Sequence, residues 1–141
     1  MPTALVVDDD PDIRGVVEYM LEQAGFQVYV ESEGQAGLER AKDLRPDVVL
    51  LDWMMPGMTG VEVCIALRTD TDMDSMAVIL LTAKARESDV QLGFAAGADE
   101  YIVKPFSPRQ MVAQVQAVLE RPRAQLPTTV CQTEISEKRV H

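Results

Sequence analysis

A short apolar run that stops at a carboxylate constrains the fold of this chain more than any other stretch. Residues 48–51 read Val-Val-Leu-Leu, Asp52 follows directly, and Pro46 and Pro56-Gly57 bound the segment. Such a run, enclosed by turn residues, predicts a strand that is covered on both faces, as in a parallel sheet. Asp52 then lies at the carboxyl end of the strand, where ligands and chemistry collect in open α/β sheets.

The rest of the chain alternates between strand and helix patterns. Apolar runs predict strands at residues 4–7, 27–31, 77–81 and 101–103, and helical spacing predicts helices at 10–25, 32–44, 59–68, 88–96 and 107–119. Thr59 and Glu62 form a capping box at the start of the third helix. Five strands alternating with five helices predict an α/β domain with a doubly wound parallel sheet, right-handed crossovers and helices on both faces.

Length and composition predict one domain followed by a short tail. The chain has 141 residues, enough for a single substantial core, and the helical pattern fades near residue 121. Residues 122–141 show no sustained period and are predicted to form a flexible tail or the start of a linker. We find no membrane-length apolar run and no export signal, and the two cysteines form no disulfide framework. These features predict a cytoplasmic protein that does not enter a membrane.

The domain is strongly acidic. Residues 1–121 contain 10 basic and 21 acidic side chains, which gives a formal charge of −11. A field of this sign repels phosphate backbones and attracts cations and basic protein surfaces. We therefore expect protein or metal-ion partners, and no direct nucleic acid binding by this domain.

Polar side chains follow four of the five predicted strands. Asp8 and Asp9 follow the first, Asp52 the third, Thr82 the fourth and Lys104 the fifth. Taken alone, each could be a helix cap, a turn residue or a solvated lysine. Together they predict one site, because clustered carboxylates need a compensating cation, and Mg²⁺ prefers such oxygen ligands.

This set also limits the chemistry of the site. The only histidine is His141 at the end of the chain, so the residues offer no imidazole base. A carboxylate can instead act as a nucleophile and form an aspartyl phosphate. Lys104 and the Thr82 hydroxyl are suited to bind the remaining phosphoryl oxygens.

The chain resembles the response regulator receiver domains of two-component signalling. The resemblance covers residues 3 to about 121 and rests on stretches that match in order: 6–10 (Val-Val-Asp-Asp-Asp), 51–60 (Leu-Asp-Trp-Met-Met-Pro-Gly-Met-Thr-Gly), 81–83, 97–98, Tyr101 and 104–106. It implies a flavodoxin-like fold with strand order 2-1-3-4-5. One departure is Thr59, where the family more often has Asp, but Thr caps the same helix.

The resemblance also implies a role for each site residue. Asp52 would be the phosphoacceptor, and Asp9, Asp52 and the Met54 backbone carbonyl would bind Mg²⁺ or Mn²⁺, with Asp8 holding a metal-bound water. Thr82 would turn toward the phosphoryl group, Lys104 would pair with it, and Tyr101 would follow Thr82 as a switch. The peptide between Lys104 and Pro105 would be cis.

The function implied is that of a signalling module. It would take a phosphoryl group from a histidine kinase or a phosphotransfer protein onto Asp52 and change its surface for a downstream protein or an attached output domain. Catalysis would be limited to its own phosphorylation and dephosphorylation.

Two other classes compete with this reading. Asp8 and Asp10 form an Asp-x-Asp motif after the first strand, as in Mg²⁺-dependent phosphatases of the haloacid dehalogenase type, where Asp8 would be the nucleophile. Pro11 and the small size of the domain count against this class. A flavodoxin-like cofactor binder is disfavoured because no glycine-rich or Ser/Thr-rich phosphate loop follows the first strand.

Overall fold

A computed structural model describes residues 1–70 and 75–121, and the predicted tail at 122–141 lies outside this range. The elements in chain order are β1 (Thr3–Val7), α1 (Pro11–Gln23), β2 (Gln27–Glu31), α2 (Gly34–Leu44), β3 (Val48–Leu51), α3 (Gly60–Thr69), β4 (Ala77–Thr82), α4 (Glu87–Ala95), β5 (Glu100–Val103) and α5 (Pro108–Leu119). The predicted alternation of strands and helices is confirmed.

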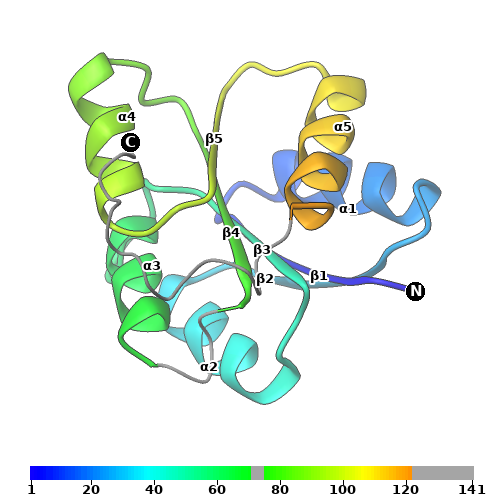
Figure 1. Ribbon diagram of the computed structural model, residues 1–141, viewed down its shortest axis with the longest axis horizontal. Helices are drawn as coiled ribbons and strands as arrows, with labels where there is room; N and C mark the ends of the chain where they lie inside the picture. The colour runs from blue at the N-terminus through cyan, green and yellow to red at the C-terminus, as the bar shows by residue number, and fades with distance from the viewer. Residues whose placement is uncertain (71–74, 122–141) are drawn as a thin grey trace.

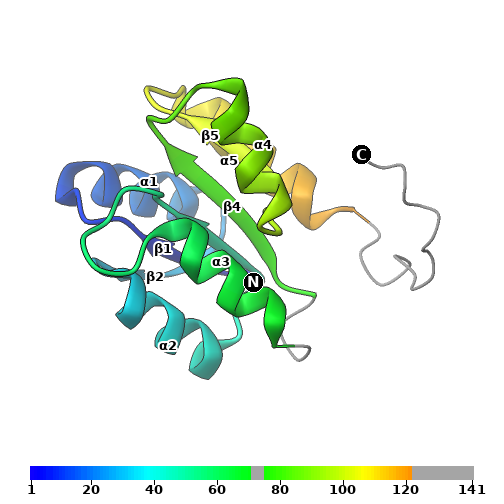
Figure 2. The same cartoon turned by 90° about the vertical axis from the view of Figure 1, so that its left-hand side faces the viewer.

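The five strands form one parallel sheet in the order β2-β1-β3-β4-β5. Helices α1 and α5 cover one face, and α2, α3 and α4 cover the other (Figure 1). Figure 2, turned by 90°, brings α2, α3 and α4 in front of the strands. The predicted fold class and strand order are therefore correct.

The alternation of side chains along each strand builds two cores. In β1, Leu5 and Val7 pack toward α2 and α3, while Ala4 and Val6 pack toward α1 and α5. All four residues of β3 are buried, because successive side chains point into opposite layers. This double burial explains why the central strands carry uniformly apolar sequences.

Local capping sets where the helices begin. The Asp10 side chain accepts hydrogen bonds from the backbone N–H groups of Asp12 and Ile13, and Thr59 and Glu62 form the predicted capping box. Helix α2 begins at Gly34, two residues later than predicted. A Cβ at Gly34 would collide with the carbonyl oxygen of Met58, so only glycine allows α2 to start against this loop.

Among the described residues, none of the helices has the length and apolar character needed to span a lipid bilayer.

Candidate functional site

The strand register brings the two acidic segments together. Val7 pairs with Leu51 in the parallel ladder of β1 and β3, so Asp8 and Asp52 leave the sheet at the same level. The N–H of Asp52 continues the ladder by donating to the Val7 carbonyl at 2.9 Å. One carboxylate oxygen from each of Asp8, Asp9 and Asp52 lies within 4.8 Å of the others. The predicted acidic cluster is thus assembled from two neighbouring strands.

Lys104 reaches this cluster from β5. Its Nζ lies 2.9 Å from Asp8 Oδ2 and 3.3 Å from Asp52 Oδ2. The peptide between Lys104 and Pro105 is cis, as the family resemblance implies. Burial alone would lower the pKa of Lys104, but the hydrogen bonds and charges of Asp8 and Asp52 outweigh it and raise the pKa. Lys104 is therefore a cation at neutral pH, placed between two carboxylates.

Asp52 occupies an environment that disfavours its charge. The residue is 7% exposed, and burial, followed by the charge of Asp8, raises the pKa of its carboxyl above the usual value. Lys104 and the N–H of Met54, which donates to Asp52 Oδ1 at 3.2 Å, oppose this rise without cancelling it. A carboxylate held between a like charge and a cation, with little water around it, is suited to bind a second cation.

Asp8 and Asp9 differ in their surroundings. Asp8 is buried, and its Oδ1 accepts the N–H of Asp10 at 2.9 Å, while Asp9 is exposed. Arg14 on α1 donates to the Asp8 carbonyl at 2.8 Å, a contact that the sequence analysis missed. Its only signal was its position one turn into the helix that Asp10 caps. The chemistry of a three-carboxylate set fits a hard divalent cation with water in its shell.

Thr82 and Tyr101 lie on adjacent strands, and both are buried. The Thr82 hydroxyl accepts the N–H of Lys84 at 3.4 Å, and the Tyr101 hydroxyl donates to the Lys84 carbonyl at 2.8 Å. Both side chains therefore engage the same residue of the loop between β4 and α4. Thr82 follows Leu81 at the edge that carries the acidic cluster, as predicted from the sequence.

The comparison with known families agrees with this geometry. The family model for the response regulator receiver domain matches residues 4–116. The chain belongs to the response regulator receiver family.

Relatives of this receiver domain include the DNA-binding response regulator MtrA of Mycolicibacterium smegmatis, which is 45% identical over 117 residues. That match covers 83% of the present chain and 50% of MtrA, so the chain spans about half the length of this curated relative. Among solved structures, the chemotaxis protein CheY4 of Vibrio cholerae aligns with a TM-score of 0.79 at 35% identity, covering 84% of this chain and 98% of CheY4. The BeF3-activated receiver domain of DrrB aligns with a TM-score of 0.78 at 37% identity, covering 86% and 99%.

The phosphatase alternative is not supported for this receiver domain. The Asp10 carboxylate, which would be the second acid of the Asp-x-Asp motif, accepts hydrogen bonds from Asp12 and Ile13 and caps α1. Asp8, the nucleophile in that alternative, is bonded to Lys104 and to the N–H of Asp10. The Asp-x-Asp motif therefore consists of one carboxylate of the acidic cluster and one helix cap.

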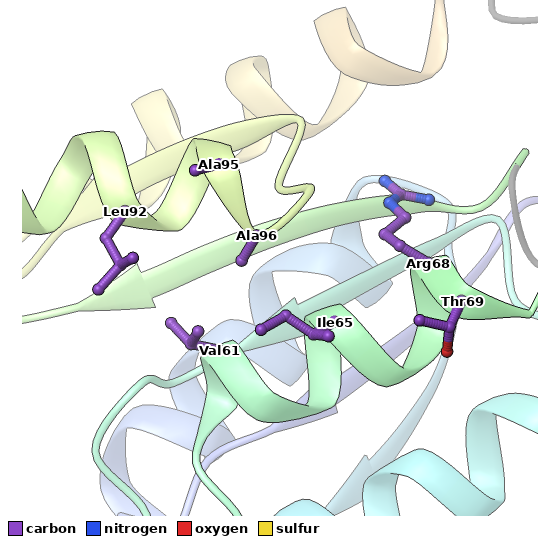
Figure 3. A pocket seen from close by; sticks show the side chains of 7 residues that line it. All are labelled: Val61, Ile65, Arg68, Thr69, Leu92, Ala95 and Ala96. Carbon is purple, nitrogen blue, oxygen red and sulfur yellow. The ribbon is translucent and has the colours of Figure 1, made fainter.

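A separate hollow of about 280 Å³ lies between α3 and α4 (Figure 3). It is lined by Val61, Ile65, Arg68, Thr69, Leu92, Ala95 and Ala96. Arg68, at one end, donates to the carbonyls of Gly97 and Met76 and pairs with Asp99 at 2.7 Å. The hollow of this receiver domain contains none of the clustered acidic residues, so we assign the chemistry to the strand ends.

Proposed function

We propose that Asp52 accepts a phosphoryl group from a histidine kinase or a histidine phosphotransfer protein. The observation that carries this proposal is the position of Lys104 Nζ, within 3.3 Å of both Asp8 and Asp52, beside the three-carboxylate cluster. Asp52 combines a strand-end position, both acidic neighbours and the lysine. Membership of the receiver family supports the same assignment.

The reaction divides among residues of this chain. A carboxylate oxygen of Asp52 attacks phosphorus, the bond from phosphorus to the donor imidazole nitrogen breaks, and that nitrogen keeps the electron pair and takes a proton from solvent. Lys104 and the Thr82 hydroxyl bind the phosphoryl oxygens. Asp9, Asp52 and the Met54 carbonyl would hold Mg²⁺ or Mn²⁺, and Asp8 would hold its water. The ion supplies positive charge that offsets the charge developing on the phosphoryl group.

The same site also supports loss of the phosphoryl group. Water attacks phosphorus, inorganic phosphate leaves, and the Asp52 carboxylate is restored. We propose that the domain catalyses only these two reactions on itself and otherwise acts as a signalling module.

The output follows from a change in surface. A phosphoryl group next to Lys104 gives the Thr82 hydroxyl a new acceptor, so Thr82 moves inward and Tyr101 occupies the space behind it. We propose that this change is read on α4, β5 and α5 by a downstream protein or an attached output domain. The formal charge of −11 over residues 1–121 supports a protein target, because it opposes direct nucleic acid binding by this domain. Family membership supports a cytoplasmic location.

Phosphorylation with a small donor tests the assignment. The protein is incubated with Mg²⁺ and acetyl phosphate, weighed by mass spectrometry, and digested to locate the modified residue. We expect one added phosphoryl group, on the peptide that contains Asp52. A modification mapped to Asp8, or none at all, would overturn the proposal.

Addition of Mg²⁺ is expected to stabilise the fold by about 1–3 kcal/mol at concentrations well above the dissociation constant, because the ion binds only the folded cluster. It should also change the fluorescence of Trp53, which is adjacent to Asp52. Asp9→Asn should weaken both effects at least tenfold in Mg²⁺ concentration, while Asp47→Asn, at the opposite end of β3 from Asp52, should leave both unchanged. If the melting temperature and the Trp53 emission do not change at millimolar-scale Mg²⁺, the proposed Mg²⁺ site is wrong.

Thr82→Ala is expected to separate phosphorylation from signalling. Amide chemical shifts are compared with and without beryllofluoride, a phosphoryl mimic. In the unaltered protein we expect shifts to spread from the strand ends to α4, β5 and α5, since Thr82 links the phosphoryl oxygens to Tyr101. In Thr82→Ala we expect them to stay near the acidic cluster. Equal spreading in both proteins contradicts the switch.

A further inference from the structure

The loop between β4 and α4 is attached to the phosphoacceptor strand by a contact that no part of the proposed reaction uses. The Lys84 ammonium lies 5.0 Å from the centroid of the Trp53 ring. Trp53 follows Asp52 directly and is 8% exposed. An ammonium over an indole face is attracted by the ring quadrupole, and partial burial strengthens this attraction.

The two partners differ in how firmly they are held. The Trp53 carbonyl accepts the N–H groups of Met55 and Gly60 at 3.2 and 3.0 Å, and Gly60 packs so closely that a Cβ would collide with the Asp52 carbonyl oxygen. Lys84 lies in a loop, and its ammonium also forms a 4.0 Å ion pair with Asp89. Trp53 is therefore held by its backbone contacts and by burial, whereas Lys84 lies on a loop and is the more mobile partner.

The same loop residue binds the switch tyrosine. The Lys84 carbonyl accepts the Tyr101 hydroxyl at 2.8 Å, and the Tyr101 ring meets the Trp53 ring edge-on at 6.4 Å between centroids. A displacement of the loop backbone at Lys84 away from Trp53 would therefore also displace the acceptor of the Tyr101 hydroxyl. Each of the three residues Trp53, Lys84 and Tyr101 thus contacts the other two, and Trp53 is directly next to Asp52 in the chain.

We propose that Trp53 and Lys84 are positioning residues, whose cation–π contact holds the β4–α4 loop so that Tyr101 keeps its buried position and its hydrogen bond to the Lys84 carbonyl. The contact biases the switch before any phosphoryl group arrives. Its consequence for signalling rests on the function proposed above, but its existence does not.

The test therefore measures conformation without phosphorylation. Lys84→Met keeps an unbranched side chain of similar length but removes its charge. In this variant we expect the rate of amide hydrogen exchange at residues 83–86 to rise about two- to fivefold. The NOE between the Trp53 and Tyr101 rings should weaken by about the same factor. Lys84→Arg should restore both values, since guanidinium also stacks on indole. Lys42→Met, an exposed lysine on α2, serves as the control and should change neither.

Two further variants identify the partner of Lys84. Trp53→Phe, with a weaker ring quadrupole, should raise exchange at residues 83–86 as Lys84→Met does, and the double variant should add little. Asp89→Asn should have a smaller effect than Lys84→Met. Unchanged exchange and NOE in Lys84→Met, or an equal effect from Asp89→Asn, overturn the proposal. Phosphoryl uptake by the same samples reports separately on the function of Asp52.

Discussion

Asp52→Asn is expected to lose phosphoryl uptake from acetyl phosphate by at least about 10³-fold, because the substitution removes the nucleophile. Asparagine has nearly the same shape and can still accept the N–H of Met54, so the strand end keeps its geometry. The measurement is the mass of the intact protein after incubation with Mg²⁺ and acetyl phosphate. Asp8→Asn is the matched comparison, since it removes the neighbouring charge and leaves the proposed nucleophile in place.

The stability of Asp52→Asn shows whether its loss of uptake is chemical. Burial and the charge of Asp8 raise the pKa of Asp52 in the folded protein. Protonated Asp52 therefore stabilises the fold fully below pH 3.8, and this stabilisation is lost as the pH rises through the raised pKa. Ionisation of Asp52 in the absence of Mg²⁺ therefore lowers the stability of the fold. Asn is neutral, so we expect a melting temperature equal to or above that of the unaltered protein. Full uptake by a folded Asp52→Asn protein would place the nucleophile elsewhere.

Lys104→Met is expected to slow phosphoryl transfer about 10²- to 10³-fold, the usual effect of losing one fixed group that stabilises charge in a transition state. Lys104 Nζ already lies within 3.3 Å of both Asp8 and Asp52, so it is positioned before the donor arrives. The measurement is the initial rate of uptake from acetyl phosphate at saturating Mg²⁺.

Lys104→Met should bind Mg²⁺ more tightly than the unaltered protein, although it transfers the phosphoryl group more slowly. Lys104 and the metal ion compete for the same carboxylates, so removing the lysine should tighten Mg²⁺ binding, as measured by Trp53 fluorescence. Lys42→Met removes an equal charge on α2 and should alter neither property. Transfer at the normal rate in Lys104→Met would exclude Lys104 from the reaction.

The strands and the edge residues were predictable because they depend on patterns that neighbouring residues carry. Residues 48–51 had to be a buried strand, since four apolar residues between turn signals leave few alternatives. Thr59 and Glu62 fixed the start of α3 through a cap that needs only local contacts. Once β1 and β3 were assigned as parallel, Asp8 and Asp52 had to meet at one edge. Their meeting follows from topology, not from any contact visible in the sequence.

Contacts between distant segments were not predictable in the same way. Arg68 pairs with Asp99, 31 positions away, and Lys84 lies over the ring of Trp53 at a similar separation. The spacing of charged residues along the chain does not predict which distant residue they contact. The Tyr101 hydroxyl donates to the backbone carbonyl of Lys84. Every residue has such a carbonyl, so the sequence does not indicate which one accepts this hydrogen bond. The start of α2 at Gly34 depends on the close approach of the Met58 backbone. Helix propensities describe single residues and cannot predict this contact.

The pair between Asp8 and Lys104 joins residues 96 positions apart in the chain. During synthesis, Asp8 and Asp52 leave the ribosome well before β5 does, and their nearest cation is then missing. Lys104 follows β5, the last strand of the sheet in chain order, so the pair forms only after β5 has been synthesised and has paired with β4. Under the function proposed above, phosphoryl uptake would therefore require that both ends of the sheet sequence, β1 and β5, are already folded into the same domain.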